Sequence, residues 1–302
     1  MFSKRFLSAA LDFAGGTPIH IASGAAALAY AVVLGPREDF KTESKPHNMA
    51  NVVLGTALIW FGWFGFNGGS ALAANTRAIM ACVVTNLAAC VGGITWVLLD
   101  YRLERKYSPM GFCAGAIAGL VSITPASGFV SPASSLAFGF FGAISCNIAM
   151  SLKHYMRYDD ALDVFAVHGV GGIVGNLLTG IFAQKWVAAL DGAEIEGGWL
   201  DGNWAQLGYQ AIDTVAGLAW SFVLTFIILF CMNKIPGLSL RVKPEKERVG
   251  LDRTELGVGA YEHVQEVLGV SLEQDGTKVK PLWMSSANGG SNVNSGMQIT
   301  GF

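Results

Sequence analysis

Two histidines in this chain follow an aspartate at the same spacing, and each leads into a long apolar run. Asp12 stands eight residues before His20 in "DFAGGTPIH", and Asp160 stands eight residues before His168 in "DALDVFAVH". An imidazole can donate or accept a proton near neutral pH, and its neutral form avoids most of the cost of a charge in an apolar interior. Two facing imidazoles could therefore relay protons through such an interior.

Simpler interpretations exist for each of these residues. A lone histidine in an apolar helix is often a core residue with a satisfied hydrogen bond, and two histidines can also ligate a haem iron. Glycine-crowded helices and the lack of a second histidine pair speak against haem. Asp12 and Asp160 suit helix N-terminal caps, with Asp163 as a second candidate cap. The functional alternative is a carboxylate that attracts a cation at a pore entrance.

The composition indicates a membrane protein. Of the 302 residues, 52% are hydrophobic and only 14% are charged, whereas soluble domains carry about 25% charged residues. The net charge of −2 says nothing about nucleic acid, but no basic stripe interleaved with aromatic residues appears, so we expect no nucleic-acid partner. The five cysteines show no CxxC spacing, so we expect neither a disulfide framework nor a metal site.

Seven apolar segments are long enough to be predicted as transmembrane helices. They are residues 17–34, 50–74, 78–99, 110–127, 133–152, 164–184 and 211–232. Glycines within these runs predict close helix–helix packing. We therefore expect a transmembrane domain over residues 1–233 and a polar tail over residues 234–302, disordered from about residue 272.

Basic residues gather in the loops after the first, third and fifth spans and in the tail. The positive-inside rule then places the tail in the cytosol and the N-terminus outside. Five spans separate His20 from His168, so their helices run antiparallel. That arrangement is the signature of an inverted repeat with a site between its copies. The predicted fold is an all-α polytopic membrane protein.

An aromatic stretch, "WFGWFGFNGGSALAAN", ends the second span on the predicted outer side. An interfacial aromatic belt explains part of it. The functional interpretation is a vestibule for a small cation, in which aromatic faces such as Trp63 attract the ion and Ser70 accepts a hydrogen bond from it. The Phe66 ring below would block the path and gate it by excluding water.

Four segments together resemble the Amt/Mep/Rh ammonium transporters, with a fungal Mep character, from about residue 10 to residue 265. They are "LDFAGGTPIHI", "WFGWFGFNGGS", "DVFAVHGVGGIVGNLLTGIFA" and "GLDRTELGVGAYE". The resemblance implies an eleven-helix fold with inverted five-helix repeats and one narrow pore per subunit, in which the seven spans correspond to helices five to eleven. It implies ammonium or ammonia as the substrate and no enzymatic activity, cofactor or metal. It also implies a multi-pass plasma-membrane protein that forms a homotrimer, or a heterotrimer with paralogues.

The same resemblance implies roles for the pore residues. His20 and His168 match the family's twin histidines, and Phe66 matches the lower ring of a paired phenylalanine gate. Ser70 matches the hydroxyl of the outer ammonium site, and Trp63 matches a nearby aromatic.

For the acidic residues, the resemblance places Asp12 near the outer vestibule, and Asp160 and Asp163 at the inner end of the tenth helix. The segment "GLDRTELGVGAYE" matches a cytosolic segment that couples neighbouring subunits. It departs from the usual pattern, because "LGV" stands where His-Gly-Glu is expected.

The first four helices of the family fold have no counterpart in this sequence. The family's first four helices carry the upper phenylalanine of the gate, the tryptophan that caps the outer site and half of the pore wall. These parts are therefore absent as well. Two interpretations are a truncated gene model and a fragment that does not conduct alone. An ammonium sensor is a further functional alternative.

Overall fold

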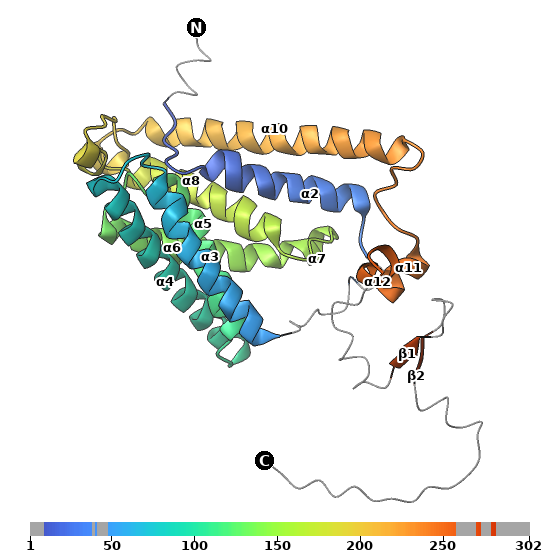
Figure 1. Ribbon diagram of the computed structural model, residues 1–302. Helices are drawn as coiled ribbons and strands as arrows, with labels where there is room; N and C mark the ends of the chain where they lie inside the picture. Colours follow the sequence, from blue (N-terminus) through green and yellow to red (C-terminus); the bar gives the residue numbers. More distant parts are fainter. Residues whose placement is uncertain (1–8, 38–39, 41–47, 258–269, 273–278, 282–302) are drawn as a thin grey trace, which may run out of the picture. The chain divides into compact units, whose positions relative to one another are not determined.

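The computed structural model describes residues 9–37, 40, 48–257, 270–272 and 279–281. Its contacts divide the chain into two units, Met1–Leu238 and Ser239–Phe302. The regular elements of the first unit's described residues are all helices, and this unit contains every segment with which the site is built (Figure 1).

The helices of the first unit follow one another with short connections. They are η1 (Gly16–Ile21), α2 (Ala22–Leu34), α3 (Met49–Gly69), α4 (Thr76–Glu104), α5 (Pro109–Ile123), η2 (Thr124–Ala126), α6 (Pro132–Met150), α7 (Leu152–Met156), η3 (Phe165–Val170), α8 (Gly171–Phe182), α9 (Lys185–Ala188), η4 (Ala189–Asp191), η5 (Trp199–Asp201) and α10 (Gln206–Lys234). Seven helical segments are long and apolar enough to cross a membrane, and they coincide with the seven predicted spans. The prediction of an all-α membrane fold is confirmed.

Local sequence signals set where the long helices begin. Asn48, Asn75, Ser108 and Ser131 each precede a helix, and each side chain accepts a hydrogen bond from a backbone N–H of the first turn. Because the first backbone N–H groups of a helix have no partner within it, such caps stabilise the start. α5 and α6 also open with proline, whose fixed φ suits the first helical position.

Small residues bring α4, α5 and α6 into close contact. A Cβ added to Gly92 would lie 2.3 Å from the carbonyl oxygen of Gly115, and one added to Gly119 would lie 2.3 Å from that of Ala88. Around these contacts lies an apolar cluster that includes Val84, Ile123 and Phe138, all fully buried. Close backbone approach lets these helices pack without large side chains between them, as the glycine content predicts.

Another close approach joins the two helices that carry the histidines. A Cβ on Gly24 in α2 would lie 2.3 Å from Cα of Gly169 in η3, and a Cβ on Gly172 in α8 would lie 2.9 Å from Cγ1 of Ile21. Gly24 stands twelve residues after Asp12, and Gly172 stands twelve residues after Asp160. Matched glycines therefore make matched contacts on both sides of this crossing.

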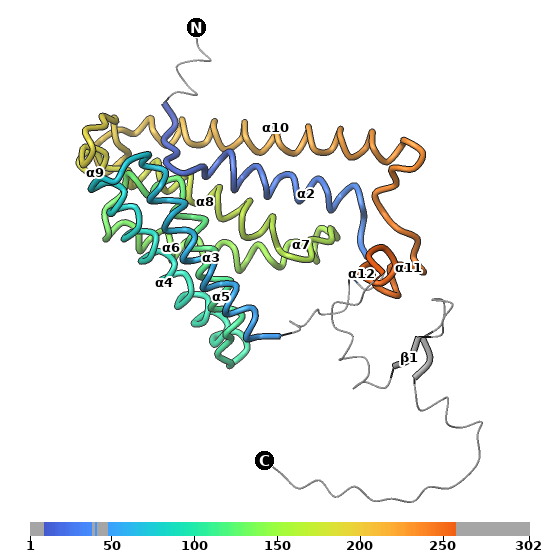
Figure 2. The backbone as a smooth tube through the Cα atoms, viewed as in Figure 1, coloured from blue at the N-terminus to red at the C-terminus, as the bar shows by residue number. Residues whose placement is uncertain are grey.

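Helix α10 runs alongside α2, as Figure 2 shows, and buried polar groups fasten it there. Nδ2 of Asn176 in α8 donates to Oγ1 of Thr214 at 2.8 Å. Gln210 accepts a hydrogen bond from the backbone N–H of Leu11 at 2.7 Å and donates to the carbonyl oxygen of the same residue at 2.8 Å. Because an unpaired buried amide is costly, this network specifies one position for α10.

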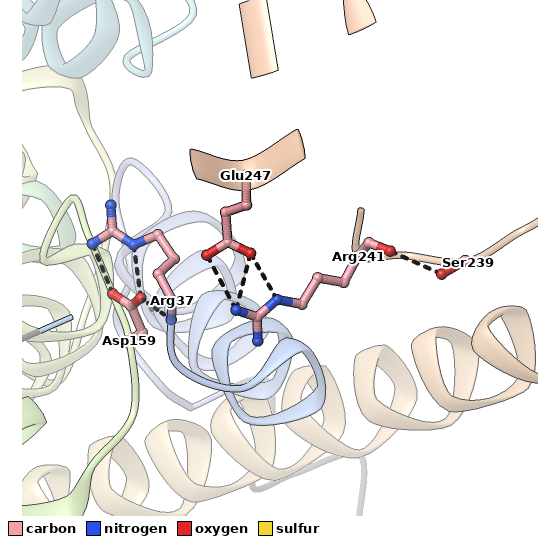
Figure 3. Close-up of polar contacts among 5 residues, drawn as sticks. All are labelled: Arg37, Asp159, Ser239, Arg241 and Glu247. Carbon is pink, nitrogen blue, oxygen red and sulfur yellow. Dashed lines mark hydrogen bonds and ion pairs between the residues drawn. The ribbon is translucent and has the colours of Figure 1, made fainter. Parts of the chain in front are cut away.

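The second unit contains two short helices, α11 (Pro244–Val249) and α12 (Leu251–Glu255), and an antiparallel pair of strands, β1 (Val270–Leu272) and β2 (Val279–Pro281). Arg241 and Glu247 form an ion pair at 3.0 Å, drawn with Ser239 in Figure 3. The strand pair is a local addition to the all-α prediction. Most of the segment predicted to be disordered, and the end of "GLDRTELGVGAYE", lie outside the described residues.

The close helix crossing leads us to predict that substitution of Gly24 lowers the stability of the fold. In Gly24→Ala the new methyl group meets the backbone of Gly169, which cannot rotate away as a side chain can. We expect the free energy of unfolding to fall by about 1–3 kcal/mol, the usual cost of overpacking. The measurement is unfolding of the purified chain by a denaturing detergent, followed by circular dichroism.

Gly62→Ala is the matched control, because Gly62 also lies within a membrane helix and a Cβ there meets nothing within 4 Å. Replacing a helical glycine by alanine in open space should leave stability unchanged or raise it by roughly 0.5–1 kcal/mol. Equal stability of the two alanine variants would contradict the tight crossing.

Candidate functional site

The two histidines meet directly at the helix crossing. Nδ1 of His20 lies 3.1 Å from Nδ1 of His168, and the ring centroids are 5.3 Å apart with an interplanar angle of 25°. His20 is 3% exposed. Each histidine lies in a π-helical turn, η1 or η3, that continues into an α-helix. Such wide turns are rare and are frequently found at functional sites.

The two aspartates bind the starts of these turns in matched ways. Asp12 accepts hydrogen bonds from the backbone N–H groups of Gly15, Gly16 and Thr17 at 2.9, 2.6 and 2.8 Å. Asp160 accepts one from Phe165 at 2.7 Å. Thr17 and Phe165 each stand five residues after their aspartate. Burial raises the pKa of the Asp12 carboxyl above its ordinary value, although the three backbone N–H groups act in the opposite direction.

The backbone conformation also matches at the third residue after each aspartate. Gly15 has φ of 99° and Asp163 has φ of 54°, so both lie in the left-handed region. The carbonyl oxygen of Gly15 accepts the N–H of Ile19 at 3.1 Å, and that of Asp163 accepts the N–H of Val167 at 2.9 Å. These residues come one position before the histidines. The same local geometry therefore aims each imidazole at the other.

Aromatic side chains from α3 cover His20. The Trp63 ring stacks on it with centroids 5.3 Å apart and an interplanar angle of 13°, and the Phe66 ring lies 6.0 Å away at 45°. Ser70, at the C-terminal end of α3, donates its hydroxyl proton to the carbonyl oxygen of Phe66 at 2.8 Å. Because that proton is already used, the lone pairs of Ser70 are left to accept a hydrogen bond.

Thr124 is a residue of this site that sequence reasoning missed. Its hydroxyl oxygen lies 3.0 Å from Nε1 of Trp63 and 3.3 Å from Nε2 of His20, and the side chain is fully buried. Thr124 stands in "TPASG" at the end of the fourth span, where the sequence shows a helix breaker before Pro125. Its two partners in the site, Trp63 and His20, lie 61 and 104 residues away in the chain, so the sequence gives no other signal.

Arg37, which follows the C-terminal end of α2, and Asp159, which precedes η3, form an ion pair (Figure 3). Asp159 accepts hydrogen bonds from the backbone N–H and Nε of Arg37 at 2.8 and 2.7 Å through one oxygen, and from Nη2 at 3.0 Å through the other. Burial acts to raise the pKa of Asp159, but the hydrogen bonds and charge of Arg37 outweigh it and hold that pKa below its ordinary value. The pair joins the loop after α2 to the segment before η3.

Two further groups beside this pair have altered proton affinity. Lys153 donates to Asp163 at 2.7 Å, yet burial of that carboxyl leaves its pKa raised. Burial first, and then the nearby charges of Asp160 and Asp163, raise the pKa of Tyr158 to about 12. Asp160 and Asp163, predicted as acids at the inner end of their helix, thus lie together, each bonded within the protein.

The contact between the imidazoles does not fit a haem. A haem iron held between two histidines would place the flat macrocycle between the two imidazole rings. The Nδ1 atoms are 3.1 Å apart with the rings in contact. The two histidines bond to each other instead.

Comparison with known proteins shows the family to which this chain belongs. The family model described as "Ammonium Transporter Family" matches residues 3–261. The chain belongs to the ammonium transporter family. It is 56% identical over 253 residues to ammonium transporter 1 of Schizosaccharomyces pombe, and 46% identical over 261 residues to ammonium transporter MEP2 of Saccharomyces cerevisiae. Its fold matches the crystal structure of Candida albicans Mep2 with a TM-score of 0.76 at 50% identity.

These matches cover most of this chain but only part of the relatives. They include 83% of this chain and 51% and 52% of the two yeast transporters, and 79% of this chain and 54% of the Candida albicans protein. The chain thus spans about half the length of the curated relatives it matches.

The Arg37–Asp159 pair predicts a pH-dependent contribution to stability. Because the pKa of Asp159 is lower in the folded protein than in the unfolded chain, the pair stabilises the fold above the ordinary aspartate pKa of about 3.9, and the contribution is lost as the pH falls through the lowered folded pKa. At pH 7, Asp159→Asn should lower the free energy of unfolding by about 1.5–3 kcal/mol, the range for hydrogen bonds to a charged group.

The difference in stability between wild type and Asp159→Asn should become smaller as the pH falls. Thermal unfolding recorded from pH 7 down to about 3 measures it. Glu196→Gln is the control, because Glu196 is an exposed loop acid, and it should melt like wild type at every pH. A difference that stays constant with pH would show that the pair does not act through the charge of Asp159.

Proposed function

We propose that this chain forms the twin-histidine part of the pore of an ammonium transporter. The observation that carries the proposal is the 3.1 Å contact between His20 and His168 beneath Trp63 and Phe66, in a chain of the ammonium transporter family. The relatives' printed names support ammonium or ammonia as the substrate.

The chemistry of the site supports a mechanism in two stages. An ammonium ion first meets aromatic faces and the lone pairs of Ser70 in an outer vestibule. Because dehydration of an ion in an apolar path is costly, the ion gives up its proton and neutral ammonia passes Phe66 and the imidazoles, with or without the proton being carried separately along the imidazoles. Potassium is excluded, since it has no proton to give and cannot shed its water there.

The acidic residues have supporting roles in this proposal. The three hydrogen bonds to Asp12 fix the turn that aims His20, on the side where the ion would enter. Asp160 performs the same task for His168, and Asp163 anchors Lys153 at the inner end. Asp12 would thus shape the outer vestibule through structure, in addition to any attraction for the cation.

The location and assembly follow from the family and the charge pattern. We propose a multi-pass plasma-membrane protein whose C-terminal tail lies in the cytosol, because the basic loops and the tail share one side of the predicted topology. We propose a homotrimer, or a heterotrimer with paralogues, as the assembly. Seven candidate spans and the family's printed names support the membrane location.

An ammonium sensor is a second candidate, favoured by one relative of known structure. The chain matches a structure titled "Sensor Amt Protein" with a TM-score of 0.73 at 35% identity. Substitutions that abolish transport but leave an ammonium-dependent signal would favour sensing. Loss of both together would favour transport.

Uptake of labelled methylammonium into vesicles that contain the purified chain tests the proposal. We expect saturable uptake that potassium does not compete, because the site selects an ion that can give up a proton. His20→Ala and His168→Ala should each lower uptake on the order of 10²-fold or more, the usual range for loss of a positioned proton-transfer group.

His154→Ala is the matched control, because His154 is an exposed histidine in α7 and lies outside the pair. It should transport like wild type. Uptake no greater than that of empty vesicles would reject transport by this chain on its own. Unchanged uptake in both pore variants would reject a role of the imidazoles in proton transfer.

A further inference from the structure

The hydroxyl group of Thr124 has as many hydrogen-bond neighbours as a hydroxyl can serve. It lies 2.8 Å from the carbonyl oxygen of Leu120, 3.0 Å from Nε1 of Trp63 and 3.3 Å from Nε2 of His20. A hydroxyl supplies one proton and two lone pairs. Three neighbours therefore fix which group donates each hydrogen bond.

Two of the three directions follow from the chemistry of the neighbours. A carbonyl oxygen can only accept, so the Thr124 proton goes to Leu120. An indole N–H can only donate, so Trp63 uses one lone pair of Thr124. The second lone pair faces Nε2 of His20, and that nitrogen must therefore carry a hydrogen to form the bond.

The position of the hydrogen on His20 also determines the position of the hydrogen on His168. With its hydrogen on Nε2, neutral His20 has a bare Nδ1. The 3.1 Å contact between the Nδ1 atoms then requires a hydrogen on Nδ1 of His168. Nε2 of His168 is left with its lone pair, and none of the residues that the structure describes gives it a hydrogen bond.

We propose that Thr124 sets the tautomers of both histidines and so makes Nε2 of His168 the proton-accepting atom of the pair. Thr124 acts as a positioning residue, since it reaches the substrate path through His20. The identity of the proton donor, ammonium, rests on the proposed function, whereas the tautomer assignment does not.

The proton-transfer step balances with these groups alone. An N–H bond of ammonium breaks, its electron pair stays on the ammonia nitrogen, and a new N–H bond forms at Nε2 of His168. The positive charge is then shared across the Nδ1–Nδ1 contact. Because Thr124 has already committed its own proton to Leu120, the excess proton does not leave through Thr124. It leaves by breaking the N–H bond at Nε2 of His168 and passes to ammonia or water in the path.

Nitrogen NMR of the whole chain in lipid nanodiscs, with labelled histidine, tests the assignment at a pH where both rings are neutral. His20 and His168 can be told apart, because Ile–His and Val–His pairs each occur once in the chain. Labelling the carbonyl carbon of isoleucine or valine therefore selects each in turn. We expect His20 to carry its hydrogen on Nε2 and His168 on Nδ1.

Three variants isolate the hydroxyl. Thr124→Val removes it with little change of shape and should turn the single tautomer of His20 into a mixture, whereas Thr124→Ser should retain the wild-type state. Thr179→Val is the matched control, since Thr179 is fully buried and bonds to the carbonyl oxygen of Gly175 at 2.8 Å in the same way. It should leave both histidines unchanged.

A hydrogen on Nδ1 of His20 in the wild-type chain would overturn the proposal, even if Thr124→Val did not fold. Identical tautomers in wild type and folded Thr124→Val would overturn it as well. The expected tautomers without methylammonium uptake would count against the proposed function and would leave the assignment standing.

Discussion

The close crossing of the two histidine-bearing helices is the constraint on which the rest of the structure depends. Gly24 and Gly169 leave no room for a Cβ between the backbones, and the imidazoles meet one turn away. If the helices stood further apart, the Nδ1–Nδ1 contact would be lost. Small residues at this one point thus determine the spacing of the polar groups in an otherwise apolar interior.

The two sides of the crossing are built in the same way. Asp12 and Asp160 each accept a hydrogen bond from a backbone N–H at the start of a π-helical turn. A residue in the left-handed region follows three positions after each aspartate, and the histidine follows eight positions after it. Inverted repeats create such matched halves, and a site between the halves receives one group from each. The imidazoles can therefore bond to each other in a buried setting without a net charge.

Much of this could be predicted from the sequence. The apolar runs gave the seven spans, and the repeated Asp-to-His spacing with an odd helix offset predicted that His20 and His168 face each other. Thr124 and the Arg37–Asp159 pair could not be predicted, because their partners lie 104 and 122 residues away in the chain. Neither residue has a local pattern that reports a distant partner, and which hydroxyl reaches a pore is decided only when the helices pack.

The central claim is that His20 and His168 share one N–H···N hydrogen bond through their Nδ1 atoms. The most direct measurement is the nitrogen–nitrogen coupling across that hydrogen bond, recorded on the labelled chain in a bilayer. A coupling between the two Nδ1 atoms in the wild-type chain, lost when Gly24→Val separates the helices, is the predicted result. A folded wild-type chain without that coupling would contradict the account.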